Sequence, residues 1–188
     1  FSDGSPNAVP KEWEDEIAKY SNAVAFWAQD PEVGQLAAAG QKSQAEIVLL
    51  FKTIHALKGN PQLHPIMQDT KRIFKFSARS ILHDSFDIKE YDNLFGKYVF
   101  KTRIPSWLPK DKQEQTTDNL FITRMYSMCP SLIDDYLQTL VKCYKSVNET
   151  GIDTEHAHYQ HIDKNYLIEF DKLHCEGIMA GTGATEVY

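Results

Sequence analysis

Apolar residues recur at intervals of three and four positions in several long segments of the chain. This spacing places them on one face of an α-helix, so each segment is predicted to form an amphipathic helix. In the first segment the apolar face consists of Trp13, Ile17, Tyr20, Val24 and Trp27. The segments with this pattern are 9–29, 44–57, 64–84 and 131–147.

Residues that begin or end helices flank these segments. Asp30, followed by Pro31, is predicted to cap a further helix, because an Asp side chain accepts hydrogen bonds from unpaired backbone N–H groups. The sequence Lys-Gly-Asn-Pro at 58–61 is predicted to end the second helix. Ser131 and Asp134 predict a capping box at the start of the fourth. The buried stripe predicted for that helix is Leu132, Ile133, Tyr136, Leu140 and Tyr144.

The remaining segments complete an all-helical prediction. Segment 90–100 could be a helix or a strand, and a helix is favoured. Segment 154–179 can form another long helix, and 104–111, with two prolines, is interpreted as a loop. No repeat or linker interrupts the chain. We therefore predict an all-α fold in which residues 1–188 form a single helical domain.

The composition narrows the partners and the compartment. The net charge is -6 and no basic block occurs, so nucleic acid is not expected as a partner. No apolar run approaches the length of a membrane span, and no signal-peptide pattern opens the chain. The 3 cysteines are widely spaced and form no CxxC motif, which favours a reducing compartment. These features predict a cytoplasmic protein without a membrane partner.

Three histidines lie close together near the end of the chain: His156, His158 and His161. Zinc needs three or four converging ligands, and His158, His161 and the distant Cys175 form an irregular set. Solvent-facing or hydrogen-bonded histidines are therefore favoured over a zinc site. Haem differs, because its porphyrin supplies four nitrogens and one imidazole from the protein is sufficient.

Five short stretches resemble, in order, segments of one enzyme family. They are LKGNPQL at 57–63, SARSILHDSFDI at 77–88, WLP at 107–109, DDYLQTLVKCYKS at 134–146 and GTGATEV at 181–187. Their sequence and order resemble the haem-dependent indoleamine 2,3-dioxygenases and the related tryptophan 2,3-dioxygenases. The resemblance covers about residues 46–187. The chain departs from the family in the haem-edge loop, where the family's glycines are missing at 76–79.

The resemblance implies a helical bundle in which residues 41–188 bind haem b and residues 1–40 form a reduced N-terminal cap. The implied function is a haem-dependent oxygenase that inserts O2 into an indole or a related aromatic amino acid. His158 is the expected axial ligand of the haem iron, and His161 is the second candidate. The haem edge is expected to contact Ser77 and Ala78.

A substrate pocket is expected between the helix 44–57 and the C-terminal glycine turn. Apolar side chains would form its wall and a few polar groups would orient the substrate. The other interpretation is that the apolar residues belong to the core and the turn to a loose tail. The substrate-binding residues expected from these considerations are Phe51, Lys52, Ile54, Gly181, Thr182 and Gly183.

Two other classes of function stay open at this point. One is a haem protein without oxygenase turnover, such as a carrier or a sensor. The other is a helical binding module without a cofactor. The sequence also leaves open whether a second chain, or a second copy of this one, completes the pocket.

Overall fold

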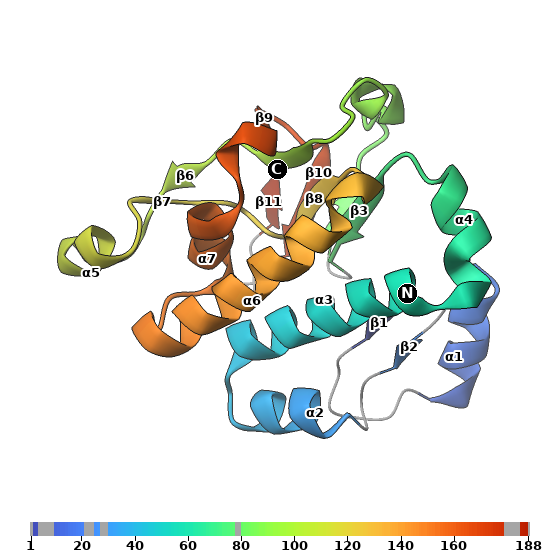
Figure 1. The fold of residues 1–188 in the computed structure, drawn as a ribbon, viewed down its shortest axis with the longest axis horizontal. Coiled ribbons are helices and arrows are strands. Elements are labelled where there is room, and N and C mark those ends of the chain that lie inside the picture. The colour runs from blue at the N-terminus through green and yellow to red at the C-terminus, as the bar shows by residue number, and fades with distance from the viewer. Residues whose placement is uncertain are drawn as a thin grey trace.

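The computed structural model of the chain describes residues 2–3, 10–20, 25–26, 30–77, 80–178 and 185–187, and every structural statement below concerns these residues. Helices and strands are mixed along the chain, and a four-stranded sheet forms one of its layers (Figure 1). The prediction of an all-α bundle is therefore wrong.

The four-stranded sheet has the order β3-β8-β5-β9. β8 is antiparallel to both of its neighbours, whereas β5 and β9 run parallel. A parallel pair needs a long crossover connection, and helices α6 and α7 form the last part of it. The strands are β3 (Ile73–Phe76), β5 (Tyr98–Lys101), β8 (Met125–Met128) and β9 (Leu167–Phe170).

Shorter strands form three smaller sheets. β4, β10 and β11 are antiparallel neighbours, β6 and β7 form an antiparallel ribbon, and β1 and β2 pair in parallel. The strands are β1 (Ser2–Asp3), β2 (Ala25–Phe26), β4 (Ser80–Leu82), β6 (Ile104–Pro105), β7 (Asn119–Leu120), β10 (Cys175–Ile178) and β11 (Thr185–Val187).

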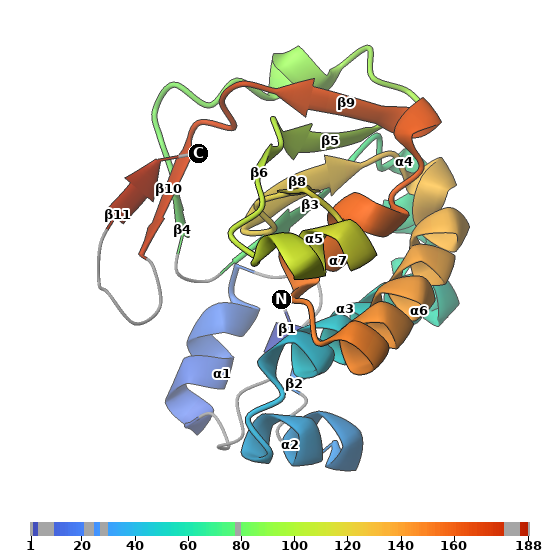
Figure 2. The same ribbon diagram turned by 90° about the vertical axis from the view of Figure 1, so that its left-hand side faces the viewer.

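Helices α3, α6 and α7 contact one another and cover one face of the four-stranded sheet (Figure 2). The α-helices are α1 (Lys11–Ala18), α2 (Pro31–Ala38), α3 (Lys42–Gly59), α4 (His64–Asp69), α5 (Lys110–Gln115), α6 (Ile133–Thr150) and α7 (Thr154–His161). The 3-10 helices are η1 (Pro61–Leu63), η2 (Ile88–Tyr91), η3 (Pro130–Leu132) and η4 (Lys164–Tyr166).

The sheet separates two apolar cores. Alternate side chains of a strand point to opposite faces, so Tyr98 and Phe100 of β5 enter the core beneath the helices. Val99, between them, enters the second core, where it meets Leu173 and Cys175. All three β5 side chains are fully buried. Burial on both faces explains why this strand shows no alternation of polar and apolar residues.

In three segments for which a helix is predicted or favoured, strand pairing takes over the later apolar residues. For 90–100 this is the strand that the pattern left as the alternative. In 64–84 the helix ends at Asp69, and the following run pairs as β3 with β8. In 90–100 the chain turns at Gly96, which has a φ of 62°, and continues as β5. The segment 154–179 is helical only as far as His161. β-Branched and aromatic residues pack well on a pleated surface, and this outweighs a weak helical periodicity.

Other helix predictions are confirmed. The Asp30 side chain accepts hydrogen bonds from the backbone N–H groups of Glu32 and Val33, as expected for a cap. α3 and α6 occupy the two strongest segments. Most of the predicted stripe of α6 is buried. The predicted capping box at Ser131 is wrong, because Ser131 lies in η3 and its hydroxyl points to the sulfur of Cys129.

The N-terminal helix is shorter than predicted. α1 ends at Ala18, and Ala25–Phe26 form β2. Trp13 and Tyr20, which the periodicity assigns to a buried face, are 63% and 83% exposed. The division of the chain near residue 40 stays a prediction. The segment 104–111, predicted as a loop, contains β6 and the start of α5.

A chain of hydrogen-bonded polar side chains crosses the core beneath the helices. The hydroxyl of Tyr126, from β8, is hydrogen-bonded to the hydroxyl of Tyr136, from α6. The Tyr136 hydroxyl also lies 3.0 Å from Nε2 of His158, and Nδ1 of His158 lies 2.8 Å from the carbonyl oxygen of Thr154. The two tyrosines and the histidine are at most 2% exposed. Each buried polar atom therefore has a partner, and the three side chains connect the sheet to both helices.

We expect Tyr136→Phe to destabilise the protein by roughly 1–3 kcal/mol, because it leaves the buried Tyr126 hydroxyl and His158 Nε2 without their shared partner. Chemical denaturation of the purified variant measures this loss. Tyr144→Phe is the matched control on the same helix, because within the described chain its hydroxyl makes no hydrogen bond. That control should stay within about 0.5 kcal/mol of the wild type. Equal stability of both variants would show that the buried chain contributes nothing.

Candidate functional site

A serine, a histidine and an aspartate form a linear hydrogen-bonded group at the start of α7. The Ser106 hydroxyl oxygen lies 2.8 Å from Nε2 of His156. On the other side of the ring, Nδ1 of His156 lies 2.6 Å from the Asp153 carboxylate. A carboxylate can only accept, so Nδ1 carries the proton and Nε2 accepts from the Ser106 hydroxyl. This tautomer is the one that a general base acting on a serine needs.

The N-terminus of α7 positions the acid and the base. Asp153 is the N-cap residue, and its carboxylate also accepts the backbone N–H of His156, at 3.0 Å. The same oxygen therefore caps the helix and orients the imidazole. Since His156 is two residues into the helix, its ring returns toward the cap. The local sequence Asp-x-x-His is sufficient to form this half of the group.

The ribbon of β6 and β7 brings in the serine. Ser106 directly follows β6, and its backbone N–H donates to the carbonyl oxygen of Asp118, at 2.9 Å. The Ser106 hydroxyl also accepts the backbone N–H of Leu108, at 3.1 Å. From α5, the Gln113 amide donates to the carbonyl oxygen of Ser106, at 3.3 Å. These bonds fix the serine from both sides, so its hydroxyl is directed at the histidine.

The base is shielded, whereas the two groups on either side of it reach the surface. His156 is 0% exposed, and the Trp107 ring lies edge-to-face against it with the ring centroids 5.1 Å apart. Ser106 is partly exposed, and the Asp153 side chain is 29% exposed. A hollow of about 480 Å³ lies beside the ribbon, and Gln113 and Asp118, which both bond to Ser106, belong to its wall. Ser106, His156 and Asp153 themselves are not part of this wall.

A second polar group lies between α3, β3 and α7. The Lys75 ammonium contacts a carboxylate oxygen of Glu46 at 3.1 Å, the hydroxyl of Ser77 at 3.0 Å and the carbonyl oxygen of Thr123 at 2.6 Å. The Thr123 hydroxyl donates to the Glu155 carboxylate, at 3.2 Å. Lys75 has three N–H donors, and all three have acceptors here. This saturation is typical of a structural connection.

Burial gives two titratable groups of α7 unusual pKa values. Burial, together with the negative charges of Glu46 and Asp153, raises the pKa of Glu155 to about 7. Burial lowers the pKa of His158 to about 4. His158 is therefore uncharged near neutral pH, and Glu155 is about half protonated there. Their titrations affect stability in opposite directions, because one is an acid and the other a base.

The surroundings of His158 do not fit a haem. Both ring nitrogens are engaged, one by the Tyr136 hydroxyl and the other by the Thr154 carbonyl oxygen. The aromatic rings of Tyr126 and Phe100 lie with their centroids 5.8 and 6.3 Å from that of the imidazole. An axial ligand needs a free nitrogen and a flat space beside it. Neither is present around His158 among the described residues.

His161, the second candidate ligand, is also engaged. Its Nε2 lies 2.7 Å from the hydroxyl of Ser146 on α6. Burial lowers the pKa of His161, and the positive charges of Lys142 and Lys164 lower it further. Across the described residues, no group of three or more His, Cys, Asp or Glu side chains is arranged to hold a metal ion. The expectation of a metal-binding protein is corrected by this finding.

The predicted substrate residues of α3 take ordinary structural positions. Ile54 is buried in the core and Phe51 packs against that core. The Lys52 ammonium forms ion pairs with Asp30, at 2.7 Å, and Glu32, at 3.2 Å. The structure does not bring these three residues together around a cavity that it describes. The predicted partners Gly181, Thr182 and Gly183 lie outside the described residues.

The predicted haem-edge residues are only partly described. Ser77 follows β3, where its backbone N–H donates to the carbonyl oxygen of Arg124 at 2.9 Å and its hydroxyl accepts from Lys75. Ala78 lies outside the described residues.

Each described helix is too short or too polar to cross a membrane.

Neither a known protein-family model nor a curated protein sequence matches this chain. The resemblance to the indoleamine and tryptophan dioxygenases therefore stays a prediction.

The group at Ser106 was missed by sequence reasoning. The sequence does contain a signal for the acid and the base. Asp153 follows Gly151, which ends the preceding helix, and lies three residues before His156, so it can cap the next helix and reach the histidine. No local signal connects Ser106 to them, because their proximity depends on how β6 and β7 pair.

We expect Glu155→Gln to make the protein more sensitive to acid. Between pH 6.5, the ordinary pKa of His158, and about 4, only the unfolded state protonates this histidine, so stability falls with pH. Between about pH 7 and 4.5, the ordinary pKa of Glu155, only the folded state holds the glutamate proton, so stability rises as pH falls. The two effects oppose each other where they overlap, and Gln removes the second.

Denaturant titrations from pH 7 to 4.5 measure this difference. The free energy of unfolding of Glu155→Gln should fall more steeply with decreasing pH than that of the wild type, by up to about 1.4 kcal/mol per pH unit. Glu149→Gln, at the exposed end of α6, is the control and should keep the wild-type slope. Identical slopes in all three proteins would contradict the raised pKa of Glu155.

Proposed function

We propose that this chain is a serine hydrolase that transfers an acyl group from a carboxylic ester or amide to Ser106 and then to water. The observation that carries the proposal is the linear group of Ser106, His156 and Asp153, with a nucleophile–base distance of 2.8 Å and a base–acid distance of 2.6 Å. Such a group is recognised by geometry and roles, whatever the fold or the chain order.

The chemistry follows from the protonation states that the hydrogen bonds require. The Ser106 oxygen attacks the carbonyl carbon while Nε2 of His156 takes the hydroxyl proton. The tetrahedral intermediate collapses when the protonated imidazole gives this proton to the leaving alcohol or amine. Water then attacks the acyl-serine with His156 again as base, which releases the carboxylic acid and restores Ser106.

Asp153 stabilises the imidazolium that forms in these steps and holds the ring in one tautomer. It is well suited to this role because the helix cap already fixes its carboxylate. Amide N–H groups stabilise oxyanions in acyl transfer, but both N–H groups of the Gln113 side chain donate to backbone carbonyl oxygens, those of Ser106 and Leu108. The backbone N–H of Ser106 donates to Asp118, so in this conformation it is not the oxyanion donor.

The wall of the adjacent hollow favours a polar substrate. Its side chains include both signs of charge and hydroxyl groups, and no large apolar side chain. A long acyl chain would gain little there, because apolar burial provides most of its binding free energy. An ester or amide with a short acyl group and polar substituents is therefore the substrate class that fits. The residues of the wall are Lys110, Gln113, Glu114, Thr116, Thr117 and Asp118.

The chain contains an internal comparison for this proposal. Ser146 of α6 and His161 of α7 form a second serine–histidine pair, at 2.7 Å. In the described structure, no carboxylate is hydrogen-bonded to the other nitrogen of His161. This pair thus lacks the orienting acid. Haem-dependent oxygenase activity remains an untested prediction, and the described residues around His158 and His161 give it no support.

A fluorophosphonate probe should label the protein at Ser106. Labelling forms a bond from the serine oxygen to phosphorus and releases fluoride, so it reports an activated hydroxyl. Ser106→Ala should reduce labelling by about a hundredfold or more, whereas Ser146→Ala should leave it unchanged. Mass spectrometry of the intact and digested protein gives both the extent and the position. Labelling that persists in Ser106→Ala, or is absent from the folded wild type, would refute the proposal.

Asp153→Asn separates the catalytic role of the carboxylate from its role as a helix cap. Asn caps helices about as well as Asp, so the melting temperature should change little. The wrong tautomer of His156 should nevertheless slow labelling by roughly a thousandfold or more. Stopped-time labelling and thermal unfolding of the same preparation measure the two effects. A variant that folds and reacts like the wild type would assign this carboxylate to capping alone.

A further inference from the structure

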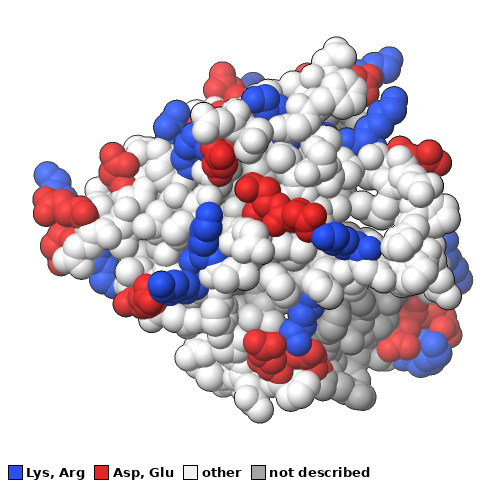
Figure 3. Space-filling model, in the orientation of Figure 1, with Lys and Arg blue, Asp and Glu red and all other residues white. Residues whose placement is uncertain are grey.

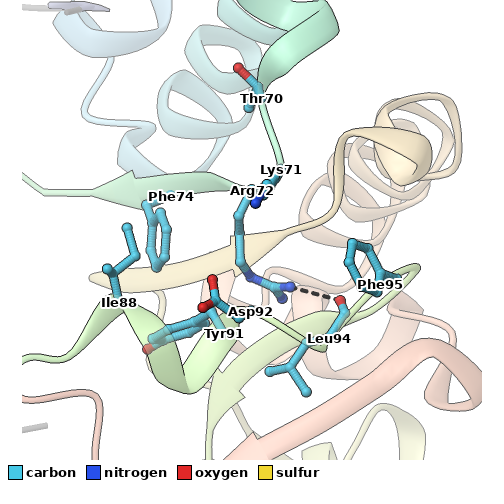
Figure 4. Close-up of a pocket in the computed structure, with 9 residues that line it drawn as sticks. All are labelled: Thr70, Lys71, Arg72, Phe74, Ile88, Tyr91, Asp92, Leu94 and Phe95. Carbon is cyan, nitrogen blue, oxygen red and sulfur yellow. Dashed lines mark hydrogen bonds between the residues drawn. The ribbon is translucent and has the colours of Figure 1, made fainter.

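A cavity of about 400 Å³ lies on the face of the sheet that the three helices leave uncovered, between the start of β3, η2 and the loop after it (Figure 4). Its volume is within the range of small-molecule sites. Phe74 and Tyr91 form its inner wall, and Phe95 and Ile88 lie at its rim, 69% and 59% exposed. The cavity is thus apolar inside and open to solvent.

Arg72 places a positive charge in this apolar cavity. Nε donates to the Ser127 hydroxyl at 2.8 Å, and the two terminal nitrogens donate to the carbonyl oxygens of Leu94 and Lys97, each at 2.9 Å. All three acceptors are neutral. The guanidinium also lies 5.5 Å from the centroid of the Tyr91 ring. These contacts hold the group rigidly in place, because they come from β8, from η2 and from the loop between η2 and β5.

This charge has no counter-ion among the described residues. No Asp or Glu oxygen in the described chain lies within 4 Å of Arg72, although Asp92 lines the same cavity. A guanidinium has five N–H donors, so two of them have no acceptor in the described structure. Placing a cation in apolar surroundings without a counter-ion is costly. An anion that enters the cavity would therefore recover both a hydrogen-bonding and an electrostatic stabilisation.

The charges around the opening also favour an anion. Lys71 and Arg72 contribute two positive charges to the lining, and Asp92 contributes one negative charge. An inorganic anion could pair with Arg72, but it would leave the aromatic wall of the cavity exposed to water, so no apolar surface would be buried on binding. Large apolar bodies without charge would leave the guanidinium unpaired. The match is best for a molecule that combines both features.

We propose that this cavity binds a small monocarboxylate with an aromatic or branched apolar body. The carboxylate accepts the two remaining N–H groups of Arg72, and the apolar body packs against Phe74, Tyr91 and Phe95. The site is separate from Ser106: in Figure 1 α4, which leads into Thr70 at the edge of the cavity, lies at the right, and β6 lies at the left. The proposal therefore does not depend on hydrolase activity.

Isothermal titration with 3-phenylpropionate tests the site, with neutral 3-phenylpropionamide and inorganic phosphate as matched probes. The carboxylate should bind at one site per chain, and both matched probes should bind at least about tenfold more weakly. Ser106→Ala should bind 3-phenylpropionate as the wild type does. Loss of binding in that variant would place the ligand at Ser106 and overturn the proposal. Equal binding of the amide would overturn the role of Arg72, and equal binding of phosphate that of the aromatic wall.

Two variants locate the ligand. Phe95→Ala removes an exposed wall, so it should fold normally and weaken 3-phenylpropionate binding by about tenfold. Val141→Ala, at a 52% exposed position on α6, is its control and should bind like the wild type. Arg72→Gln should abolish binding, and a thermal melt of each variant shows whether the fold is intact. Unchanged affinity in Phe95→Ala would refute this location.

Discussion

Three buried polar side chains of one short helix determine how the layers of this protein fit together. Thr154, His156 and His158 of α7 are at most 1% exposed. Each is satisfied by a different element: the first turn of α3, the ribbon end at Ser106, and α6. A buried polar atom without a partner costs about as much as a single substitution in the core. The helix can therefore occupy its place only if all three elements also occupy theirs.

The same requirement explains why the proposed hydrolase site is rigid. The bonds that satisfy a buried imidazole are also the bonds that orient a base between a hydroxyl and a carboxylate. His156 needs partners at both nitrogens because it is buried, and Ser106 and Asp153 provide them. The partners of His158 are the Tyr136 hydroxyl and the Thr154 carbonyl oxygen. This arrangement contains no serine that the histidine could activate as a nucleophile. The difference between a site and a core contact thus lies in the identity of the partners.

The sequence predicts helices where packing and local pattern agree. α3 and α6 have long apolar stripes, and the Asp30 cap depends only on its immediate neighbours. The strands were not predictable in this way, because their residues are buried by pairing with segments far away in the chain. β5 is apolar on both faces and shows neither period. The sequence singles out the histidine-rich segment for a haem ligand, whereas the hydrogen-bond partner of His156 is Ser106, which lies fifty residues earlier and which no local pattern connects to it.

The parallel pairing of β5 with β9 also constrains how the protein can be synthesised. Tyr98 to Lys101 pair with Leu167 to Phe170. A ribosome has therefore produced the whole intervening segment before β5 acquires its second neighbour. During that interval β5, whose side chains Tyr98, Val99 and Phe100 are fully buried in the finished fold, presents an open edge of backbone N–H and C=O groups. Such edges recruit other unfolded chains. In a cell that produces this protein rapidly, the nascent chain would be a natural client for a chaperone.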